Sequence, residues 1–110
     1  MPYDKALAAL ADPTRRKLLE SIRRQDRTVN ELASLARITQ PAASQHLRVL
    51  VDARLATNRR DGTRRYYRAR AEGLAELRRY IESFWDDALA AFADADNPAP
   101  KSRKKKGASG

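Results

Sequence analysis

The side chains of this 110-residue chain best suited to chemistry are polar groups that recognise bases and phosphates. A glutamine amide can pair with the edge of adenine, and an arginine guanidinium can bind guanine or a phosphate. Gln40, Gln45 and Arg48 lie close together in the sequence, and four arginines surround Asp61-Gly62 a short distance further on. These residue types at this spacing predict that the segment binds a nucleic acid.

Catalysis and metal binding are not expected. The chain has no cysteine, and His46 is its only histidine. A general base needs a nucleophile and an orienting acid, and a metal site needs further ligands. No such set and no glycine-rich phosphate loop occurs, so we expect no enzyme, no cofactor and no metal. His46 is expected to bond a neighbouring backbone group or a phosphate.

The positive charge is unevenly distributed. The formal net charge is +9, of which residues 37–70 contribute +7 with nine arginines against two aspartates. Residues 71–96 carry −5, and residues 101–110 carry +5. A basic excess of this kind indicates a polyanionic partner, with nucleic acid as the first candidate. No apolar run is long enough to cross a bilayer and no secretory leader is expected, so we expect a cytoplasmic protein.

Apolar spacing and capping residues predict four helices in the first half of the chain. The first covers residues 3–11, and the second follows Asp12-Pro13 and includes Leu18, Leu19 and Ile22. Thr28-Val29-Asn30-Glu31 forms a capping box that opens the third. Thr39 caps the fourth, which carries Pro41 in its first turn and runs to about Ala53.

The second half predicts a β-hairpin and one long helix. Segments 55–60 and 64–70 flank Asp61-Gly62, where both residues are expected at positive φ in a tight turn. Residues 72–93 carry an apolar stripe at helical spacing, and the chain beyond Asn97 is expected to be disordered. We therefore expect a mainly α fold with a small β-hairpin (α+β). It is a winged helix-turn-helix of five helices and a two-stranded wing, in a domain of residues 1–96 with a basic tail at 97–110.

The helix at residues 39–53 is expected to enter a DNA major groove. At about 100° per residue, its polar residues occupy one sector of about 140°. Ala43, Leu47 and Leu50 lie on the adjoining sector and are expected to pack on the third helix. The alternative is an ordinary amphipathic helix, with wing arginines that serve solubility or protect an edge strand. The DNA-binding residues expected are Thr39, Gln40, Pro41, Ser44, Gln45, Arg48, Arg59, Arg60, Arg64 and Arg65. Which of these arginines reach bases stays open.

The last helix carries more apolar surface than the end of one small domain needs. Its stripe could belong to the core, but a seam between two subunits is favoured, because it would also give a two-fold DNA-binding surface. The interface residues expected are Leu7, Leu10, Leu77, Ile81, Phe84, Trp85, Ala88 and Phe92. The half-sites on DNA should then lie about one helical turn apart.

Together these segments resemble the ArsR/SmtB family of bacterial winged-helix repressors over residues 5–93. The resemblance rests on residues 9–16, residues 29–33, residues 40–50, Ala53-Arg54-Leu55 and the wing at residues 59–67. It implies a homodimer joined by the first and last helices. It also implies repression at palindromic operators, often in the regulator's own promoter.

Two departures indicate the metal-free branch of that family. Metal-sensing members carry a cysteine pair on the third helix, where this chain has Ala33 and Leu35, and other members use histidines on the last helix, which has none here. The aromatic pair Phe84-Trp85 resembles that of the metal-free branch, whose inducer is often unknown. Two further functions stay open: a non-specific architectural DNA-binding protein associated with the nucleoid, or a sensor that holds an organic ligand between its first and last helices.

Overall fold

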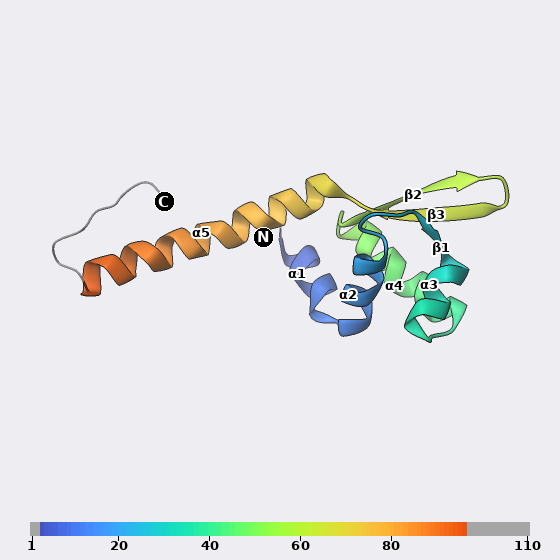
Figure 1. Ribbon diagram of the computed structural model, residues 1–110, viewed down its shortest axis with the longest axis horizontal. Coiled ribbons are helices and arrows are strands. Elements are labelled where there is room, and N and C mark those ends of the chain that lie inside the picture. Colours follow the sequence, from blue (N-terminus) through green and yellow to red (C-terminus); the bar gives the residue numbers. More distant parts are fainter. Residues whose placement is uncertain (1–2, 97–110) are drawn as a thin grey trace. The chain divides into compact units, whose positions relative to one another are not determined.

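The computed structural model describes residues 3–96, and the expected tail at residues 97–110 lies outside this range. Five helices and three strands follow one another along the chain (Figure 1). They are α1 (Asp4–Ala11), α2 (Pro13–Ser21), β1 (Arg27–Thr28), α3 (Val29–Ala36), α4 (Gln40–Asp52), β2 (Ala56–Asp61), β3 (Arg64–Ala69) and α5 (Ala71–Asp96). The expected five helices and hairpin are confirmed, with bounds that differ by a few residues at α5.

The wing contains a strand that the sequence did not predict. β1 pairs antiparallel with β3, Arg27 opposite Tyr67 and Thr28 opposite Tyr66, so the sheet order is β1-β3-β2. The expected two-stranded wing is therefore a three-stranded sheet at its base. The hairpin of β2 and β3 continues beyond β1 (Figure 1). Two residues are too few to show the alternating pattern by which a strand is recognised.

The turn of the hairpin lies one residue later than expected. Asp61 and Arg64 are paired across the two strands, so Gly62 and Thr63 form the turn. Gly62 has a φ of +66°, whereas Asp61 and Thr63 are not at positive φ. A glycine in the left-handed region at the first central position is the pattern of a type II′ turn, so the prediction of two positive angles at Asp61-Gly62 was wrong.

Side-chain caps fix the starts of the helices. Thr28 accepts from the amide of Glu31 while Glu31 accepts from the amide of Thr28, which confirms the capping box. Asp12 accepts from the amides of Thr14 and Arg15 at 2.8 and 3.2 Å, ahead of Pro13. These hydrogen bonds favour the carboxylate and hold the pKa of Asp12 below its ordinary value. Helices α2 and α3 therefore begin where their first free amides find a side-chain partner.

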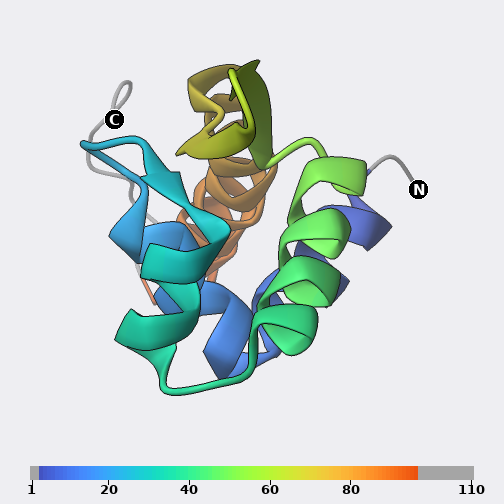
Figure 2. The same ribbon diagram turned by 90° about the vertical axis from the view of Figure 1, so that its right-hand side faces the viewer.

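The core is built around α2 and α4. The side chains inaccessible to solvent are those of Leu18 in α2, Ile22 just after it, Leu32 in α3, and Leu47 and Leu50 in α4. Burial of one such side chain contributes about 1.5–3 kcal/mol. Figure 2 shows α4 beside the N-terminal helices with the wing at one end. The core thus fixes the position of α4 relative to the wing.

One expected core residue lies outside its predicted helix. Ile22 is the C-cap of α2, one residue after the helix ends at Ser21. Its side chain is nonetheless fully buried, and its carbonyl accepts from the amide of Ala69 at the end of β3, at 3.0 Å. The end of α2 is thereby tied to the sheet.

The chain divides into two compact units, Met1–Leu77 and Arg78–Gly110. The first contains the four short helices, the sheet and the start of α5. The second contains the rest of α5. Within it, Tyr80 and Phe84 meet edge to face at 4.9 Å, and Arg78 forms an ion pair with Glu82 one turn further on.

Candidate nucleic-acid interface

Helix α4 presents the predicted polar residues on its exposed side. Ala43, Leu47 and Leu50 are completely buried, and α4 contacts α3 as expected. The residues expected to contact DNA from this helix are all exposed: Thr39, Gln40, Pro41, Ser44, Gln45 and Arg48. The structure therefore brings these side chains together on one open face, which also includes the exposed Val49.

The N-terminus of α4 is fixed by Thr39. Its hydroxyl accepts from the amide of Ala42 at 3.2 Å, and Pro41 occupies one of the first helical positions, where no amide hydrogen is needed. The orientation of Gln40 and Ser44 is thus set by a rigid helix start. Thr39 acts in the structure as a cap, and its contact with DNA stays a prediction.

His46 has a side-chain partner. Its Nδ1 lies 3.4 Å from Nη1 of Arg15 on α2. Nε and Nη2 of the same guanidinium donate to the carbonyl oxygens of Ala9 and Ala8 in α1. This arginine links α1, α2 and α4, and the expected backbone or phosphate partner of His46 stays a prediction.

The register of the wing sorts its arginines onto two faces. Residues directly opposite each other across β2 and β3 share a face, and successive residues alternate. Arg60 and Arg65 are paired, and they share a face with Asn58 and the buried Tyr67. Arg59, Arg64 and Arg68 lie on the other face. The four arginines expected to bind DNA are thus exposed but do not form a single surface.

Asp26, in the loop between α2 and β1, holds two arginines of that other face. Its carboxylate accepts from Nε of Arg68 at 2.6 Å and lies 3.1 Å from Nη2 of Arg59. The guanidinium of Arg59 also lies 4.8 Å from the ring centre of Tyr66, a cation–π distance. Partial burial raises the pKa of Asp26, but the hydrogen bonds and charges of Arg68 and Arg59 outweigh it and the pKa is lowered. Part of the wing's positive charge is therefore neutralised within the chain.

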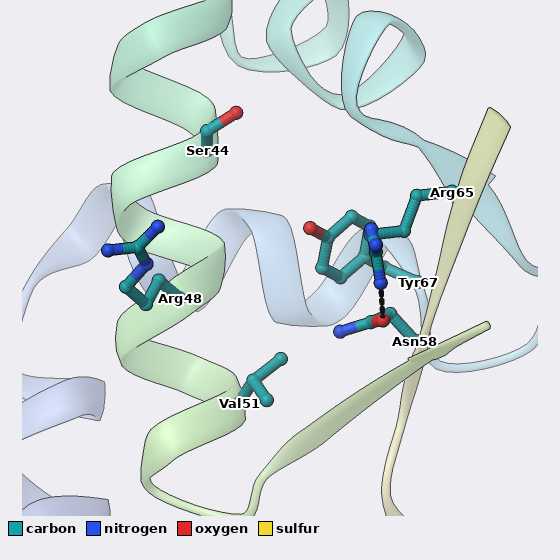
Figure 3. A pocket seen from close by; sticks show the side chains of 6 residues that line it. All are labelled: Ser44, Arg48, Val51, Asn58, Arg65 and Tyr67. Carbon is teal, nitrogen blue, oxygen red and sulfur yellow. Dashed lines mark hydrogen bonds between the residues drawn. The ribbon is translucent and has the colours of Figure 1, made fainter. Parts of the chain in front are cut away.

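An open groove separates α4 from the wing face that carries Asn58, Arg65 and Tyr67 (Figure 3). Its volume is about 410 Å³. Nη1 of Arg65 donates to Oδ1 of Asn58 at 2.6 Å, across the diagonal of the hairpin. The groove is lined by Ser44, Arg48, Val51, Asn58, Arg65 and Tyr67. Residues of α4 and of the wing that are far apart in the sequence thus border one basic surface.

The predicted subunit interface is largely exposed. The exposed fractions of Phe84, Trp85 and Phe92 are 58%, 63% and 65%, and Ile81 and Ala88 are exposed as well. In the first unit Leu7 is exposed and Leu10 is half-buried. Leu77 differs from the rest of the predicted set, because it is 6% exposed and has almost no surface left for a partner.

Residues 3–96 contain no group of three histidine, cysteine, aspartate or glutamate side chains placed to hold a metal ion. In the same range, no helix combines the length and the apolar character needed to span a bilayer.

The comparisons with known proteins agree with this geometry. Residues 12–58, which run from the cap of α2 into the wing, match the family described as bacterial regulatory protein, arsR family. The chain is 46% identical over 90 residues to the HTH-type transcriptional regulator Rv2034 of Mycobacterium tuberculosis, covering 82% of this chain and 84% of that protein. The chain belongs to the ArsR family.

A second relative and a solved structure extend the likeness. A probable mercury resistance operon repressor of Streptomyces lividans is 46% identical over 69 residues, which cover 63% of this chain and 55% of that protein. A homodimeric winged helix-turn-helix DNA-binding domain from Mycobacterium bovis is 30% identical, with a TM-score of 0.64 over 80% of this chain and 82% of that one. This ArsR-family chain is accordingly a DNA-binding transcriptional regulator, as its sequence predicted, rather than an enzyme.

Proposed function

We propose that this ArsR-family protein is a homodimeric, sequence-specific repressor of transcription. In this proposal α4 enters the major groove of a palindromic operator, and the wing at residues 59–67 contacts the adjacent backbone. The observation that carries it is the exposed polar face of α4, whose amides and hydroxyls stand on a helix anchored by three fully buried residues. A rigid helix with neutral donors and acceptors at its start suits direct recognition of base edges.

The homodimer is supported by the exposed apolar side chains of α5. A second copy of the chain covers Phe84, Trp85 and Phe92 in this proposal, since three exposed aromatic side chains on one helix are costly to hydrate. The solved Mycobacterium bovis domain is described as homodimeric, and the Streptomyces lividans relative is named as a repressor. Leu7 and Leu10 of α1 belong to the same proposed interface.

The proposed regulator acts without a metal, in the cytoplasm at the nucleoid. Its sequence has no cysteine and a single histidine, and that histidine contacts Arg15. An operator in the protein's own promoter would make it autoregulatory. The inducer that this proposal allows is a small organic molecule.

Footprinting of the protein on its own upstream DNA tests the proposal, with a shuffled duplex of equal length as the control. We expect protection of two half-sites about one helical turn apart, and a preference for the operator that persists as salt is raised. Equal binding of both duplexes, lost in parallel with salt, would instead identify the second candidate, an architectural DNA-binding protein.

A further inference from the structure

The groove between α4 and the wing is lined by hydrogen-bond donors and contains no acidic side chain. The hydroxyls of Ser44 and Tyr67 and the guanidinium groups of Arg48 and Arg65 border it, and Val51 is its apolar member. In Figure 3 the Tyr67 hydroxyl points from the wing toward α4 and Arg65 lies beside it, while Ser44 projects from α4 toward the wing and the Arg48 guanidinium lies on the other side of the helix. Donors of this kind around an open space suit an anion with several acceptor oxygens.

Asn58 fixes Arg65 at the edge of this groove. Its Oδ1 accepts from Nη1 of Arg65 at 2.6 Å, so a neutral side chain sets the orientation of the guanidinium (Figure 3). The guanidinium keeps its charge, because its partner is neutral. It also keeps its remaining N–H groups for a ligand. Arg59 on the other face differs, because the carboxylate of Asp26 neutralises it.

We propose that this groove binds one phosphate of the DNA backbone, with Arg65 as the charged ligand from the wing and Asn58 as the residue that positions it. The proposal rests on the proposed function and assigns unequal roles to arginines that the sequence could not distinguish. Phosphate is favoured over a base because the lining supplies hydroxyl and guanidinium donors and no acidic side chain, which suits a ligand whose oxygens only accept. The contact then adds affinity without sequence preference.

The test measures the affinity of the full chain for operator and shuffled duplexes across a range of salt concentrations. Arg65→Ala is expected to weaken both duplexes alike, on the order of tenfold, and to reduce the slope of log affinity against log salt by about 0.9. Arg64→Ala is the matched control, because it removes the same charge from the adjacent residue on the opposite face. Its effect should be clearly smaller.

Two substitutions of Asn58 separate positioning from a merely structural role. Asn58→Ala should weaken binding less than Arg65→Ala and should have no further effect in an Arg65→Ala background. Asn58→Asp keeps an acceptor for Arg65 but neutralises its charge, so it should lower the salt slope as Arg65→Ala does. Urea unfolding checks that each variant keeps its fold.

The possible outcomes are distinguishable. Equal effects of Arg64→Ala and Arg65→Ala, additive effects of Asn58→Ala and Arg65→Ala, or a loss confined to the operator would each overturn the phosphate site. If the wild type shows no operator preference, the proposed repressor fails. The salt slopes on the shuffled duplex would still decide whether Arg65 binds a phosphate.

Discussion

Nη1 of Arg15 on α2 lies 3.4 Å from Nδ1 of His46 on α4. The same guanidinium donates at 2.8 Å to the carbonyl oxygen of Ala9, in the last turns of α1. One side chain thereby joins α1, which belongs to the proposed dimer interface, to the helix proposed to recognise DNA.

Arg15→Ala should lower the free energy of unfolding by about 1–3 kcal/mol, because it removes three side-chain hydrogen bonds at once, two of them partly buried. It should also weaken operator binding by releasing His46 and α4. Arg16→Ala is the matched control, since Arg16 donates to the carbonyl oxygens of Leu10 and Ala11 in α1 rather than to a group of α4. Urea unfolding and DNA titration of the two variants measure both effects. Equal losses of operator affinity would show that the His46 contact is irrelevant.

Gly73→Ala should destabilise the protein, although alanine is the better helix former. A Cβ at Gly73 would overlap the carbonyl oxygen of Arg54, so the start of α5 would have to move away from the end of α4. We expect a loss of about 1–3 kcal/mol from overpacking, opposite in sign to the usual gain of about 1 kcal/mol. Gly62→Ala provides the comparison, because its Cβ would meet nothing within 4 Å and only the positive φ is costly. Thermal unfolding of both variants should separate overpacking at Gly73 from backbone strain at Gly62. A gain in stability for Gly73→Ala would refute the overpacking.

The ion pairs of Asp26 should make the free energy of unfolding depend on pH. The pKa of Asp26 is lowered in the folded chain from an ordinary value of 3.8, so the unfolded chain binds a proton more readily. The stabilisation is therefore fully present above the unfolded pKa and is lost as pH falls through the folded pKa. Asp26→Asn should lower the free energy of unfolding by less than about 1 kcal/mol near neutral pH, since its partners are largely exposed.

The measurement is urea unfolding of the wild type and Asp26→Asn at about pH 7 and at about pH 3. The difference between the two proteins should shrink at the lower pH, where the carboxylate begins to be protonated. A difference that stayed constant or grew would contradict the proposed role of Asp26. Glu20→Gln, an exposed substitution on α2, serves as the control for loss of one negative charge.

Much of the fold follows from local signals, and the misses have local causes. The capping residues Asp12, Thr28 and Thr39 begin helices because each side chain satisfies amides within three residues of it. The ends of α3 and α4 are less visible in the sequence. Arg37 and Arg54 adopt the left-handed conformation after these helices, at φ 58° and 64°, where glycine is usual. No residue type therefore marks the two helix ends.

Only those parts of the candidate site that depend on residues close together in the sequence could be predicted. The polar face of α4 follows from helical periodicity, and the structure exposes every residue expected there. The partners of the arginines do not follow, because Asp26 lies 33 residues from Arg59 and 42 from Arg68 in sequence. Asn58 and Arg65 are related only through the strand register, which depends on the turn at Gly62-Thr63. The turn predicted at Asp61-Gly62 would place Asn58 directly opposite Arg65, whereas the observed register pairs Asn58 with Tyr67 and Arg65 with Arg60. The two registers keep Asn58 and Arg65 on one face, but the diagonal hydrogen bond between them could be found only in the structure.

Alanine at Gln40, Ser44 and Gln45 together should abolish the operator preference of a repressor. A paired contact to a base edge contributes about 1–3 kcal/mol of discrimination, so the loss on the operator should exceed tenfold while the shuffled duplex changes little. Asn30→Ala, an exposed polar residue on α3, is the control. Competition titrations with both duplexes measure the ratio. An unchanged ratio would favour the architectural DNA-binding protein.

The proposed dimer can be tested by one charge placed on either side of α5. Ala88 and Ala90 are both exposed, but they lie about 160° apart around the helix. Ala88 shares the stripe of Ile81, Trp85 and Phe92. Ala88→Glu would thus bury an unpaired carboxylate in the interface, whereas Ala90→Glu would leave it in water.

Sedimentation at micromolar concentration should find a monomer for Ala88→Glu and a dimer for Ala90→Glu. Operator affinity should fall only for Ala88→Glu, because a monomer contacts one half-site. If both variants stay dimeric, the stripe is not the interface. If the wild type is a monomer and still binds its operator fully, operator binding does not require a dimer.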